Sequence, residues 1–289
     1  MYDLILNPHA QGGKAVKKAE RLEKILKEKG AEYRIHLTSA PKDATYIAKK
    51  LSEEGATDIV AVGGDGTIHE VLNGIDCEKV NFGIIPLGSG NDFVASAGIP
   101  LDLGEAVDIL LNCPPKPTDY MVCDGVRGLN VIGTGIDVDI LKRCLKSKIL
   151  RGKLQYLWSL VISLIEFKFY KFGLKNEKGE REDEEALIAC VGNGSRFGGG
   201  IRICPTAEID DGKLDFVVVG KLKKIRIPFA FIKLMQGKIL EQDFTTLKYA
   251  EKVEIDFDAP VTIQIDGELY DNLKFDLSVE KGKLMLIRP

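Results

Sequence analysis

The chain has 289 residues, about twice the length of a typical domain of ~150 residues, so we expect two domains. A net charge of −3 argues against a nucleic-acid-binding protein, which is usually basic. No signal peptide precedes the first strand, and no run of ~18 apolar residues indicates a transmembrane helix. These features predict a cytoplasmic protein whose six cysteines are reduced.

The first 117 residues alternate short apolar runs with helical patterns. Strands are predicted at Tyr2–Asn7, Glu32–Leu37, Asp58–Val62 and Asn81–Pro86, and helices at Lys14–Lys29, Pro41–Glu54, Ile68–Asn73, Asp92–Ala97 and Leu103–Leu111. This order predicts an α/β domain with a doubly wound parallel sheet.

The proline-rich stretch Asn112–Thr118 is predicted to be a linker, which gives domains at 1–117 and 118–289. After it, strand-like runs dominate, so the second domain is predicted to be mainly antiparallel β, with its last residues packing back on the first domain. Its predicted strands are Tyr120–Cys123, Gly128–Ile132, Ala186–Gly192, Leu214–Val219, Lys252–Phe257, Val261–Ile265 and Leu284–Ile287. Helices are predicted near Gln155–Phe167 and Ile225–Gln236, and a solvated loop at Asn176–Glu185.

The strongest local pattern is a strand that ends in Gly63-Gly64-Asp65-Gly66-Thr67 and leads directly into a helix. Glycines let the backbone approach a ligand closely, and the N–H groups at a helix start attract phosphate. Because the Asp65 carboxylate would repel a bare phosphate, the pattern favours a nucleotide bound with Mg²⁺. The alternative is a tight structural turn with a solvated aspartate.

A second glycine-rich turn follows the next strand and contains Gly88, Ser89, Gly90, Asn91 and Asp92. Its hydroxyl and backbone N–H groups are predicted to line the same phosphate pocket, because loops at the carboxyl ends of adjacent parallel strands converge. The alternative is that Asn91 or Asp92 caps the next helix. Asn7, with Pro8 and the later Lys14, would add a third loop at this end of the sheet.

Together, Asn7-Pro8, Gly63–Thr67 and Gly88–Phe93 resemble the diacylglycerol kinase catalytic family, in particular the soluble bacterial lipid kinases, over nearly the whole chain. The resemblance implies an ATP- and Mg²⁺-dependent lipid kinase of lipid metabolism, with diacylglycerol as the first substrate to consider. Thr38 resembles a nucleotide-contact position of the family; its alternative role is to cap a helix. Many members carry an arginine after Asn-Asp-Phe. Here Asp92-Phe93 is followed by Val-Ala-Ser, and the candidate substitutes are Arg151, Lys153 and Arg202.

The second half carries two further blocks that resemble this family, Cys204–Gly212 and Gln264–Glu268. By resemblance, either Asp266 or Glu268 is the base near the lipid hydroxyl. A structural Mg²⁺ would be held by the Glu208 and Asp211 side chains and the Lys213 backbone carbonyl. Taken without the resemblance, Asp210-Asp211-Gly212 and Asp266-Gly267 are both favourable hairpin turns.

Two segments are candidates for lipid contact. Leu154–Phe172 is apolar and aromatic, and is read either as a buried helix or as the lining of an acyl-chain pocket. Lys221–Lys238 mixes five lysines and one arginine with apolar residues, and is read either as an ordinary amphipathic helix or as a segment that lies on an anionic membrane. The expected partners are therefore a lipid substrate and the inner membrane surface, not nucleic acid, and a homodimer through a sheet edge is plausible. Rival functions are an NAD kinase-like or other small-molecule kinase, and a non-catalytic nucleotide- or lipid-binding regulator.

Overall fold

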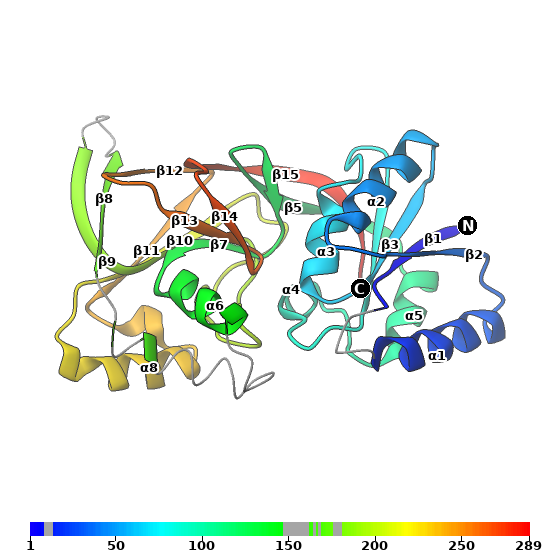
Figure 1. The fold of residues 1–289 in the computed structure, drawn as a ribbon, viewed down its shortest axis with the longest axis horizontal. Coiled ribbons are helices and arrows are strands. Elements are labelled where there is room, and N and C mark those ends of the chain that lie inside the picture. Colours follow the sequence, from blue (N-terminus) through cyan, green and yellow to red (C-terminus); the bar gives the residue numbers. More distant parts are fainter. Residues whose placement is uncertain (9–13, 147–161, 164–165, 167–168, 176–180) are drawn as a thin grey trace. The chain divides into compact units, whose positions relative to one another are not determined.

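The computed structural model describes residues 1–8, 14–146, 162–163, 166, 169–175 and 181–289 (Figure 1). The chain forms two compact units. Unit 1 comprises Met1–Tyr120, Ile209–Asp211 and Glu280–Pro289, and unit 2 comprises Met121–Glu208 and Gly212–Val279. Two strands, β5 (Pro115–Cys123) and β15 (Phe275–Ile287), run from one unit into the other.

Unit 1 is built on a parallel sheet in which the strand order is β2-β1-β3-β4. These strands are β1 (Tyr2–Leu6), β2 (Tyr33–Leu37), β3 (Asp58–Gly63) and β4 (Asn81–Pro86). β1 pairs in parallel with both β2 and β3. After β1, the chain therefore places β2 on one side of it and then β3 and β4 on the other side. Such a reversal of strand order creates a crevice at the carboxyl ends of the strands, where ligands bind in doubly wound folds.

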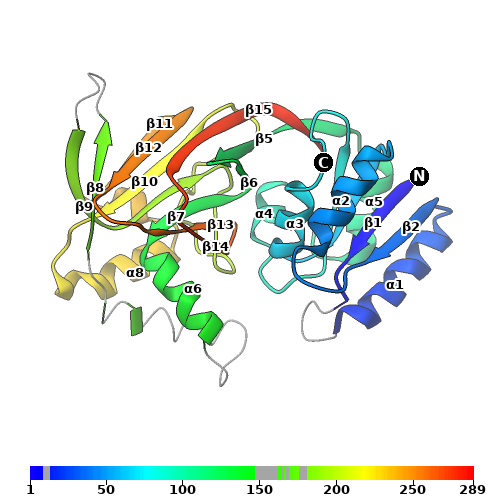
Figure 2. The ribbon, with the colours of Figure 1, turned by 45° about the horizontal axis from the view of Figure 1, so that its top comes forward.

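The helices of unit 1 form two packed pairs, which cover opposite faces of the sheet (Figure 2). α1 (Lys14–Glu28) packs with α5 (Leu103–Asn112), and α2 (Asp43–Glu53) packs with α3 (Asp65–Leu72). The short α4 (Asp92–Ser96) follows β4. The central strands are buried on both faces, which explains their continuous apolar sequences. The predicted doubly wound α/β fold is confirmed.

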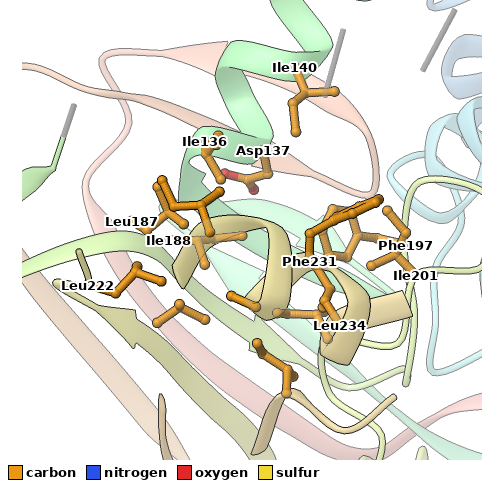
Figure 3. A pocket seen from close by; sticks show the side chains of 15 residues that line it. Ile136, Asp137, Ile140, Leu187, Ile188, Phe197, Ile201, Leu222, Phe231 and Leu234 are labelled. Carbon is orange, nitrogen blue, oxygen red and sulfur yellow. The ribbon is translucent and has the colours of Figure 1, made fainter. Parts of the chain in front are cut away.

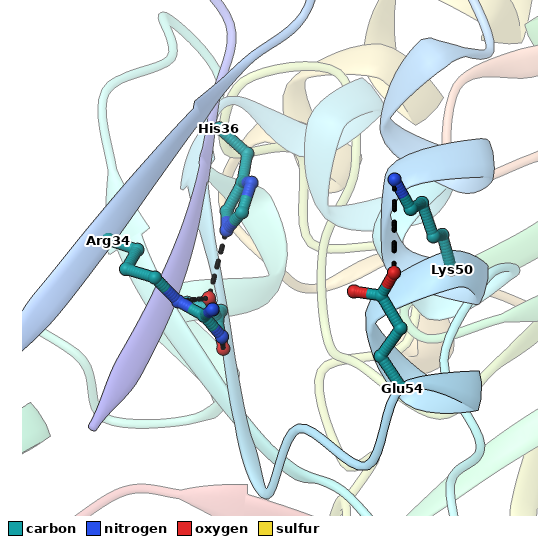
Figure 4. A network of polar contacts seen from close by, with 5 residues as sticks. Arg34, His36, Lys50 and Glu54 are labelled. Carbon is teal, nitrogen blue, oxygen red and sulfur yellow. Dashed lines mark hydrogen bonds and ion pairs between the residues drawn. The ribbon is translucent and has the colours of Figure 1, made fainter.

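A buried carboxylate holds β1 and β2 in register. Asp3 and Arg34 are directly paired in the sheet, and the Arg34 guanidinium donates two hydrogen bonds, of 2.8 and 2.9 Å, to the Asp3 carboxylate. His36 Nε2 lies 2.8 Å from the same carboxylate. Figure 4 shows the Arg34 and His36 side chains with their contacts as dashed lines. Burial, the largest single influence, would raise the pKa of Asp3. The hydrogen bonds from Arg34 and His36 outweigh it and lower that pKa.

Unit 2 is mainly antiparallel β with two described α-helices. The remaining strands are β6 (Val126–Gly128), β7 (Val131–Gly135), β8 (Tyr170–Lys175), β9 (Arg181–Gly192), β10 (Leu214–Gly220), β11 (Thr245–Ala250), β12 (Lys252–Phe257), β13 (Thr262–Ile265) and β14 (Glu268–Asp271). The helices are α6 (Ile136–Lys146) and α8 (Ile227–Met235), and short 3₁₀ turns lie at Lys224–Arg226 and Ile239–Glu241. This class of fold was predicted correctly.

The long strand β9 separates two hydrophobic cores in unit 2. Ala189 and Val191 belong to a core formed between strands, whereas Ile188 and Cys190 belong to a second core that includes residues of α6 and α8. Successive side chains of a strand point to opposite faces, so alternate residues of β9 serve the two cores. Residues 186–191 of β9 therefore form a continuous apolar run although the neighbouring strands pair antiparallel.

Two predictions about this half of the chain are wrong. The expected linker Asn112–Thr118 ends inside β5, where Pro115 is the first residue of a strand that lies off the main path of the sheet, a position that tolerates a missing N–H group. Residues 181–185 of the expected loop Asn176–Glu185 are strand, because their charged side chains pair across neighbouring strands, as Glu185 does with Lys171. The predicted helix Gln155–Phe167 lies almost wholly outside the described residues.

Candidate functional site

The two glycine-rich turns of unit 1 lie against one another at the carboxyl ends of β3 and β4. A Cβ atom added at Gly88 would overlap the Cα atom of Gly64, and one added at Gly63 would overlap the Thr67 side chain. The backbone N–H groups of Leu87 and Gly88 donate hydrogen bonds of 2.7 and 3.1 Å to the Gly63 carbonyl. Only glycine allows backbones to approach this closely. The strand order and the glycine spacing together therefore explain why these two turns meet.

Asp65 joins the first turn to the second. Its carboxylate accepts a 2.7 Å hydrogen bond from the backbone N–H of Asn91 and a 2.9 Å bond from that of Asp92. A Cβ atom at Gly90 would lie only 2.6 Å from the same carboxylate. Asp65 is the first residue of α3, which begins three residues before the predicted start at Ile68. The carboxylate thus has a structural role that the sequence did not reveal, in addition to its predicted role near Mg²⁺.

Asn91 closes the second turn instead of capping the helix that follows. Its side-chain amide donates to the Gly88 carbonyl at 2.9 Å and accepts from the Gly88 N–H at 3.1 Å. Asn91 occupies the N-cap position of α4 with a φ of 55°, but its side chain makes no capping hydrogen bond. The capping alternative is therefore wrong for Asn91, and its side chain instead fixes the shape of the turn.

The other predicted nucleotide contacts lie at the same edge of the sheet. Asn7 follows β1, and its N–H donates to the Val62 carbonyl of β3 at 3.3 Å. Thr38 is buried after β2, and Lys42, not Thr38, is the N-cap residue of α2, so the capping alternative for Thr38 is also wrong. Ser89 is exposed in the second turn. Residues 9–13 and the side chain of Lys14 lie outside the described part of the chain.

This edge of unit 1 suits a polyphosphate. The first turn of α3 contains Gly66 and Thr67, and the N–H groups of a first helical turn have no acceptor within their helix. Together with the positive end of the helix dipole, such groups attract phosphate oxygens. A Cβ atom at Gly63 would overlap the Thr67 side chain, and one at Gly64 or Gly88 would meet the backbone of the opposite turn, so the glycines are what lets the two turns pack together at this edge.

The predicted base residues of unit 2 lie on one hairpin but in different environments. Asp266 and Gly267, with φ values of 53° and 91°, form the two-residue turn between β13 and β14, so the turn interpretation is confirmed. The Asp266 carboxylate accepts backbone N–H bonds from Leu129 at 2.7 Å, Asn130 at 2.8 Å and Val131 at 3.2 Å. Asp266 therefore braces the start of β7. Glu268 is exposed at the first position of β14.

The sequence analysis did not identify residues 129–131 as part of the site. Its role comes from backbone N–H groups, which any residue could supply, so side-chain chemistry gave no signal. The nearest hint is the buried pair of asparagines, of which Asn193 donates to the Leu129 carbonyl at 2.9 Å and Asn130 donates to the Arg196 carbonyl at 2.8 Å. These bonds fix the same segment that holds Asp266.

The predicted structural Mg²⁺ ligands lie on the exposed turn before β10. Glu208, Asp211 and Lys213 are all exposed there, and oxygen ligands from two carboxylates and a carbonyl match the preference of Mg²⁺. The neighbouring Asp210 is instead paired with Arg288 at 2.5 Å. Within the described residues, no group of three acidic, histidine or cysteine side chains is arranged to hold a metal. The Mg²⁺ assignment stays a prediction.

The candidate substitutes for the family arginine are not brought to the glycine turns by any described contact. Arg202 is exposed in unit 2, and Arg151 and Lys153 lie outside the described residues. Among the helices that the structure describes, none is long and apolar enough to cross a membrane.

Two family models together match most of the chain. The diacylglycerol kinase catalytic domain matches residues 2–123, and the YegS C-terminal NAD kinase beta sandwich-like domain matches residues 130–288. A protein of Chromohalobacter salexigens named "probable lipid kinase YegS-like" is 28% identical over 99% of this chain and 92% of its own length. A diacylglycerol kinase of Bacillus subtilis is 27% identical over 92% of this chain and 88% of its own.

Solved structures agree with these sequence matches. A crystal structure from Bacillus anthracis str. Sterne, provisionally named a diacylglycerol kinase, superposes with a TM-score of 0.81 and 25% identity. The superposition covers 100% of this chain and 95% of the other. The likeness therefore extends over both units.

Proposed function

Because the chain belongs to the lipid kinase family that joins a diacylglycerol kinase catalytic domain to a YegS-type C-terminal domain, we propose that it transfers the γ-phosphate of ATP to a lipid hydroxyl. Diacylglycerol is the proposed substrate, because relatives over nearly the full length carry the name diacylglycerol kinase. The proposed product is phosphatidic acid.

The observation that best supports this proposal is the contact between the two glycine turns of unit 1. Gly64 and Gly88 touch through their backbones at the ends of adjacent parallel strands, beside the N-terminus of α3. This arrangement suits a chain of phosphates and leaves little room for a bulky side-chain contact. Phosphoryl transfer depends mainly on positioning and charge neutralisation, which such a cradle supplies.

The residues of the chain divide the proposed work as follows. The backbone of Gly63–Thr67 and Gly88–Asn91 binds and orients the phosphates, with Asn7, Thr38 and Ser89 at the same edge. When bound, Mg²⁺ supplies neutralisation of phosphate charge. Asp65 and Asp92 are the proposed carboxylates near the catalytic ion, and Glu208, Asp211 and the Lys213 carbonyl are proposed to hold the structural one.

Glu268 is proposed to accept the proton of the lipid hydroxyl as its oxygen attacks. The assignment follows from the contrast with Asp266, whose carboxylate already accepts three backbone N–H groups and braces the hairpin on which Glu268 begins β14. A general base must have an oxygen available to the hydroxyl. Glu268 is exposed and can be reached from solvent, and Asp266 acts as a positioning residue.

The direct test is incubation of the purified protein with γ-labelled ATP, Mg²⁺ and a panel of lipids in mixed micelles. Labelled phosphatidic acid is expected. The variant G88A should lose turnover by at least a hundredfold, because its new methyl group overlaps Gly64. The matched control is G104A, at a helical glycine where a Cβ atom would only approach Asp102 Oδ1 at 3.2 Å, and it should keep full turnover. A parallel incubation offers NAD in place of the lipids, and labelled NADP there, without any labelled lipid in the first incubation, would contradict the proposal.

A second comparison separates the base from the brace. E268Q should lower kcat by about 10²–10⁴-fold, the range of general base catalysis, with the free energy of unfolding unchanged. D266N should lower both the stability of unit 2 and turnover, because an amide cannot accept all three backbone hydrogen bonds. If E268Q keeps full turnover, Glu268 is not the base.

A further inference from the structure

A short segment of unit 1 lies between β2 and α2, at the same edge of the parallel sheet as the two glycine turns. It begins at Thr38, whose N–H donates to the Leu6 carbonyl of β1 at 2.9 Å and whose side chain is buried. Residues 39–42 are all exposed, so apolar packing contributes little to their conformation. Hydrogen bonds must therefore set the shape of residues 38–42, here called the β2–α2 segment.

The β2–α2 segment ends in a helix start that lacks a cap of its own. Lys42 occupies the N-cap position of α2 with a φ of 70° and makes no side-chain capping hydrogen bond. A positive φ is unfavourable for a lysine, and such conformations persist where surrounding contacts impose them. The N–H groups of the first helical turn also need acceptors from outside the helix. The start of α2 is therefore held by another part of the chain.

Glu70 of α3 supplies these contacts. One oxygen of its carboxylate accepts from the Lys42 N–H at 3.0 Å, and the other accepts from the Ala44 N–H at 3.2 Å. A second carboxylate acts at the end of the segment, because Asp43 accepts from the Ser39 N–H at 2.7 Å and from the Ser39 hydroxyl at 2.9 Å. Glu70 thus links the β2–α2 segment to a different helix.

α3 therefore contacts the loops on both sides of it. Asp65, its first residue, holds the second glycine turn through the N–H groups of Asn91 and Asp92. Glu70 lies one and a half turns later in the same helix, and side chains at this spacing project about 140° apart around the helix axis. The helix that begins in the first glycine turn thus connects three loops at the proposed nucleotide site.

The carboxyl groups of the chain differ in what they contact. Asp137 is buried among apolar side chains in unit 2, as Figure 3 shows. Both oxygens of the half-buried Glu70, in contrast, accept backbone N–H groups at the start of α2. A carboxylate in this position also interacts favourably with the helix dipole. Glu70 therefore occupies the place at α2 where an anionic ligand would bind, which leaves the start of α3 for the proposed phosphates.

A second contact between α2 and α3 offers a control, because it joins the two helices without reaching the β2–α2 segment. The Thr45 hydroxyl donates to the Glu70 backbone carbonyl at 2.8 Å. A Cβ atom at Gly74 would lie 2.3 Å from the Thr45 carbonyl oxygen, so the backbones are in close contact here. Loss of the Thr45 hydroxyl should therefore weaken the packing of α2 on α3 while the Glu70 carboxylate still holds Lys42.

We propose that Glu70 is a positioning residue for nucleotide binding. The proposal rests on the proposed function, because it assigns the β2–α2 segment to the ATP site through Thr38. Glu70 holds this segment in its binding conformation before the nucleotide arrives, and such preorganisation increases affinity. Glu70 does not touch the reacting atoms, so the rate of phosphoryl transfer from bound ATP should not depend on it.

The sign of the effect separates positioning from simple charge. A negative charge repels a polyphosphate, so removal of an acidic side chain near the site should strengthen ATP binding or leave it unchanged if charge alone matters. If Glu70 positions the β2–α2 segment, its removal should instead weaken ATP binding. A loss of affinity on removal of this acidic residue is therefore the informative result.

The test is calorimetric titration of ATP with Mg²⁺ into the full chain and four variants. E70A, which removes both acceptors, should weaken ATP binding by roughly tenfold or more, and E70Q, which keeps one acceptor oxygen, by about fivefold. D43A, which releases Ser39 in the same segment, should weaken it by about fivefold as well. The control T45V should bind ATP within about twofold of the wild type, because the segment keeps its contacts.

Further measurements separate positioning from a general loss of structure. Circular dichroism and urea unfolding show that each variant folds, and T45V should lose about as much stability as E70Q, since each loses one hydrogen bond. E70Q and T45V are the deciding pair if E70A does not fold. Hydrogen exchange of the Lys42 and Ala44 N–H groups should accelerate in E70A and not in T45V. In the lipid kinase assay, E70A should raise the KM for ATP while kcat stays within about twofold of the wild type.

Three results would overturn the proposal. Wild-type affinity for ATP in both E70A and E70Q would show that Glu70 does not affect the site. An equal loss of affinity in E70Q and T45V would show that any loosening of α2 on α3 has the same effect. A loss in E70A without a loss in D43A would show that Glu70 acts on the nucleotide directly and not through the segment.

The failure of the proposed function gives a different pattern. A wild-type protein that binds no ATP would contradict the proposed function and this proposal together. ATP binding that depends on Glu70 and Asp43, in a protein that labels no lipid, would support the positioning role and contradict only the lipid kinase activity.

Discussion

Replacement of Asp65 tests whether its carboxylate holds the two glycine turns together before any ligand binds. In D65A the N–H groups of Asn91 and Asp92 lose their acceptor, at hydrogen-bond distances of 2.7 and 2.9 Å in the wild type. Each hydrogen bond to a charged group contributes about 1.5–3 kcal/mol. Because water can reach part of this edge, we expect D65A to lower the free energy of unfolding of unit 1 by about 3 kcal/mol.

The amide variant gives an intermediate expectation. D65N keeps one acceptor oxygen for the two N–H groups, so we expect a loss of about 1.5 kcal/mol, roughly half that of D65A. The matched control is D102A, in which an exposed carboxylate that accepts from the N–H groups of Gly104 and Glu105 is removed. An exposed N-cap of this kind contributes about 1 kcal/mol.

The assay is urea unfolding without nucleotide, combined with hydrogen exchange of residues 87–93. The exchange of the Asn91 and Asp92 N–H groups should accelerate in D65A and stay unchanged in D102A. A carboxylate that served only to orient a metal ion would leave the stability of the ligand-free protein unchanged or higher when removed. A loss in D65A no larger than that in D102A would therefore refute the structural role of Asp65.

Two pH-dependent predictions follow from buried carboxyl groups. Because burial raises the pKa of Asp137 to about 7 in the folded protein, its contribution to stability is complete below pH ~4 and is lost as the pH rises towards 7, by on the order of 4 kcal/mol. Of its titratable neighbours, Cys190 and Tyr170 have raised pKa values and stay neutral there, which leaves Asp139 as the nearby charge. D137N should show no such loss in urea unfolding from pH 4 to 8, and a parallel decline in both proteins would contradict the prediction. The pH dependence of stability that Asp3 contributes has the opposite sign. Its pKa is lowered in the folded protein, so its stabilisation is present above pH ~4 and is lost as the pH falls through that lowered pKa. D3N should lower stability by about 2 kcal/mol at pH 7 and by less at pH 3, and an equal effect at both would exclude a role for the ionised carboxylate.

The order of elements in unit 1 could be predicted because each element carries its own signal. Asn81–Pro86 was predicted with the observed bounds, and Asp58–Val62 with one residue fewer than β3. Buried parallel strands are apolar throughout, and glycine turns mark their ends. The start of α3 was placed three residues late, at Ile68 instead of Asp65, since glycines and an aspartate are poor helix formers in isolation. Tertiary contacts of the first turn override that preference.

The strand boundaries in the second half were harder to predict because charged strands and prolines weaken the local signal. The charged residues 181–185 are typical of a loop in the sequence. In the structure, β8 pairs with them and supplies oppositely charged partners, as Lys171 does for Glu185. The proline-rich stretch before Thr118 is typical of a linker in the sequence. In the structure it enters β5, which accommodates a proline as its first residue. In both cases the deciding contacts come from neighbouring strands of the sheet.

The sequence by itself determined the α/β class of the first unit, the mainly β class of the second and the identity of the glycine turns, because these depend on periodicity and on residue types with special backbone freedom. Only the tertiary structure decided which carboxylates accept hydrogen bonds from the protein's own backbone. Asp65 and Asp266 read as reactive groups in the sequence, yet each accepts hydrogen bonds from backbone N–H groups of a distant segment. Asp137, which the sequence analysis passed over, is the carboxyl group that lies in an apolar pocket. The physical reason is that desolvation and hydrogen bonding depend on neighbours brought together by folding, and a residue type in a linear chain does not specify those neighbours.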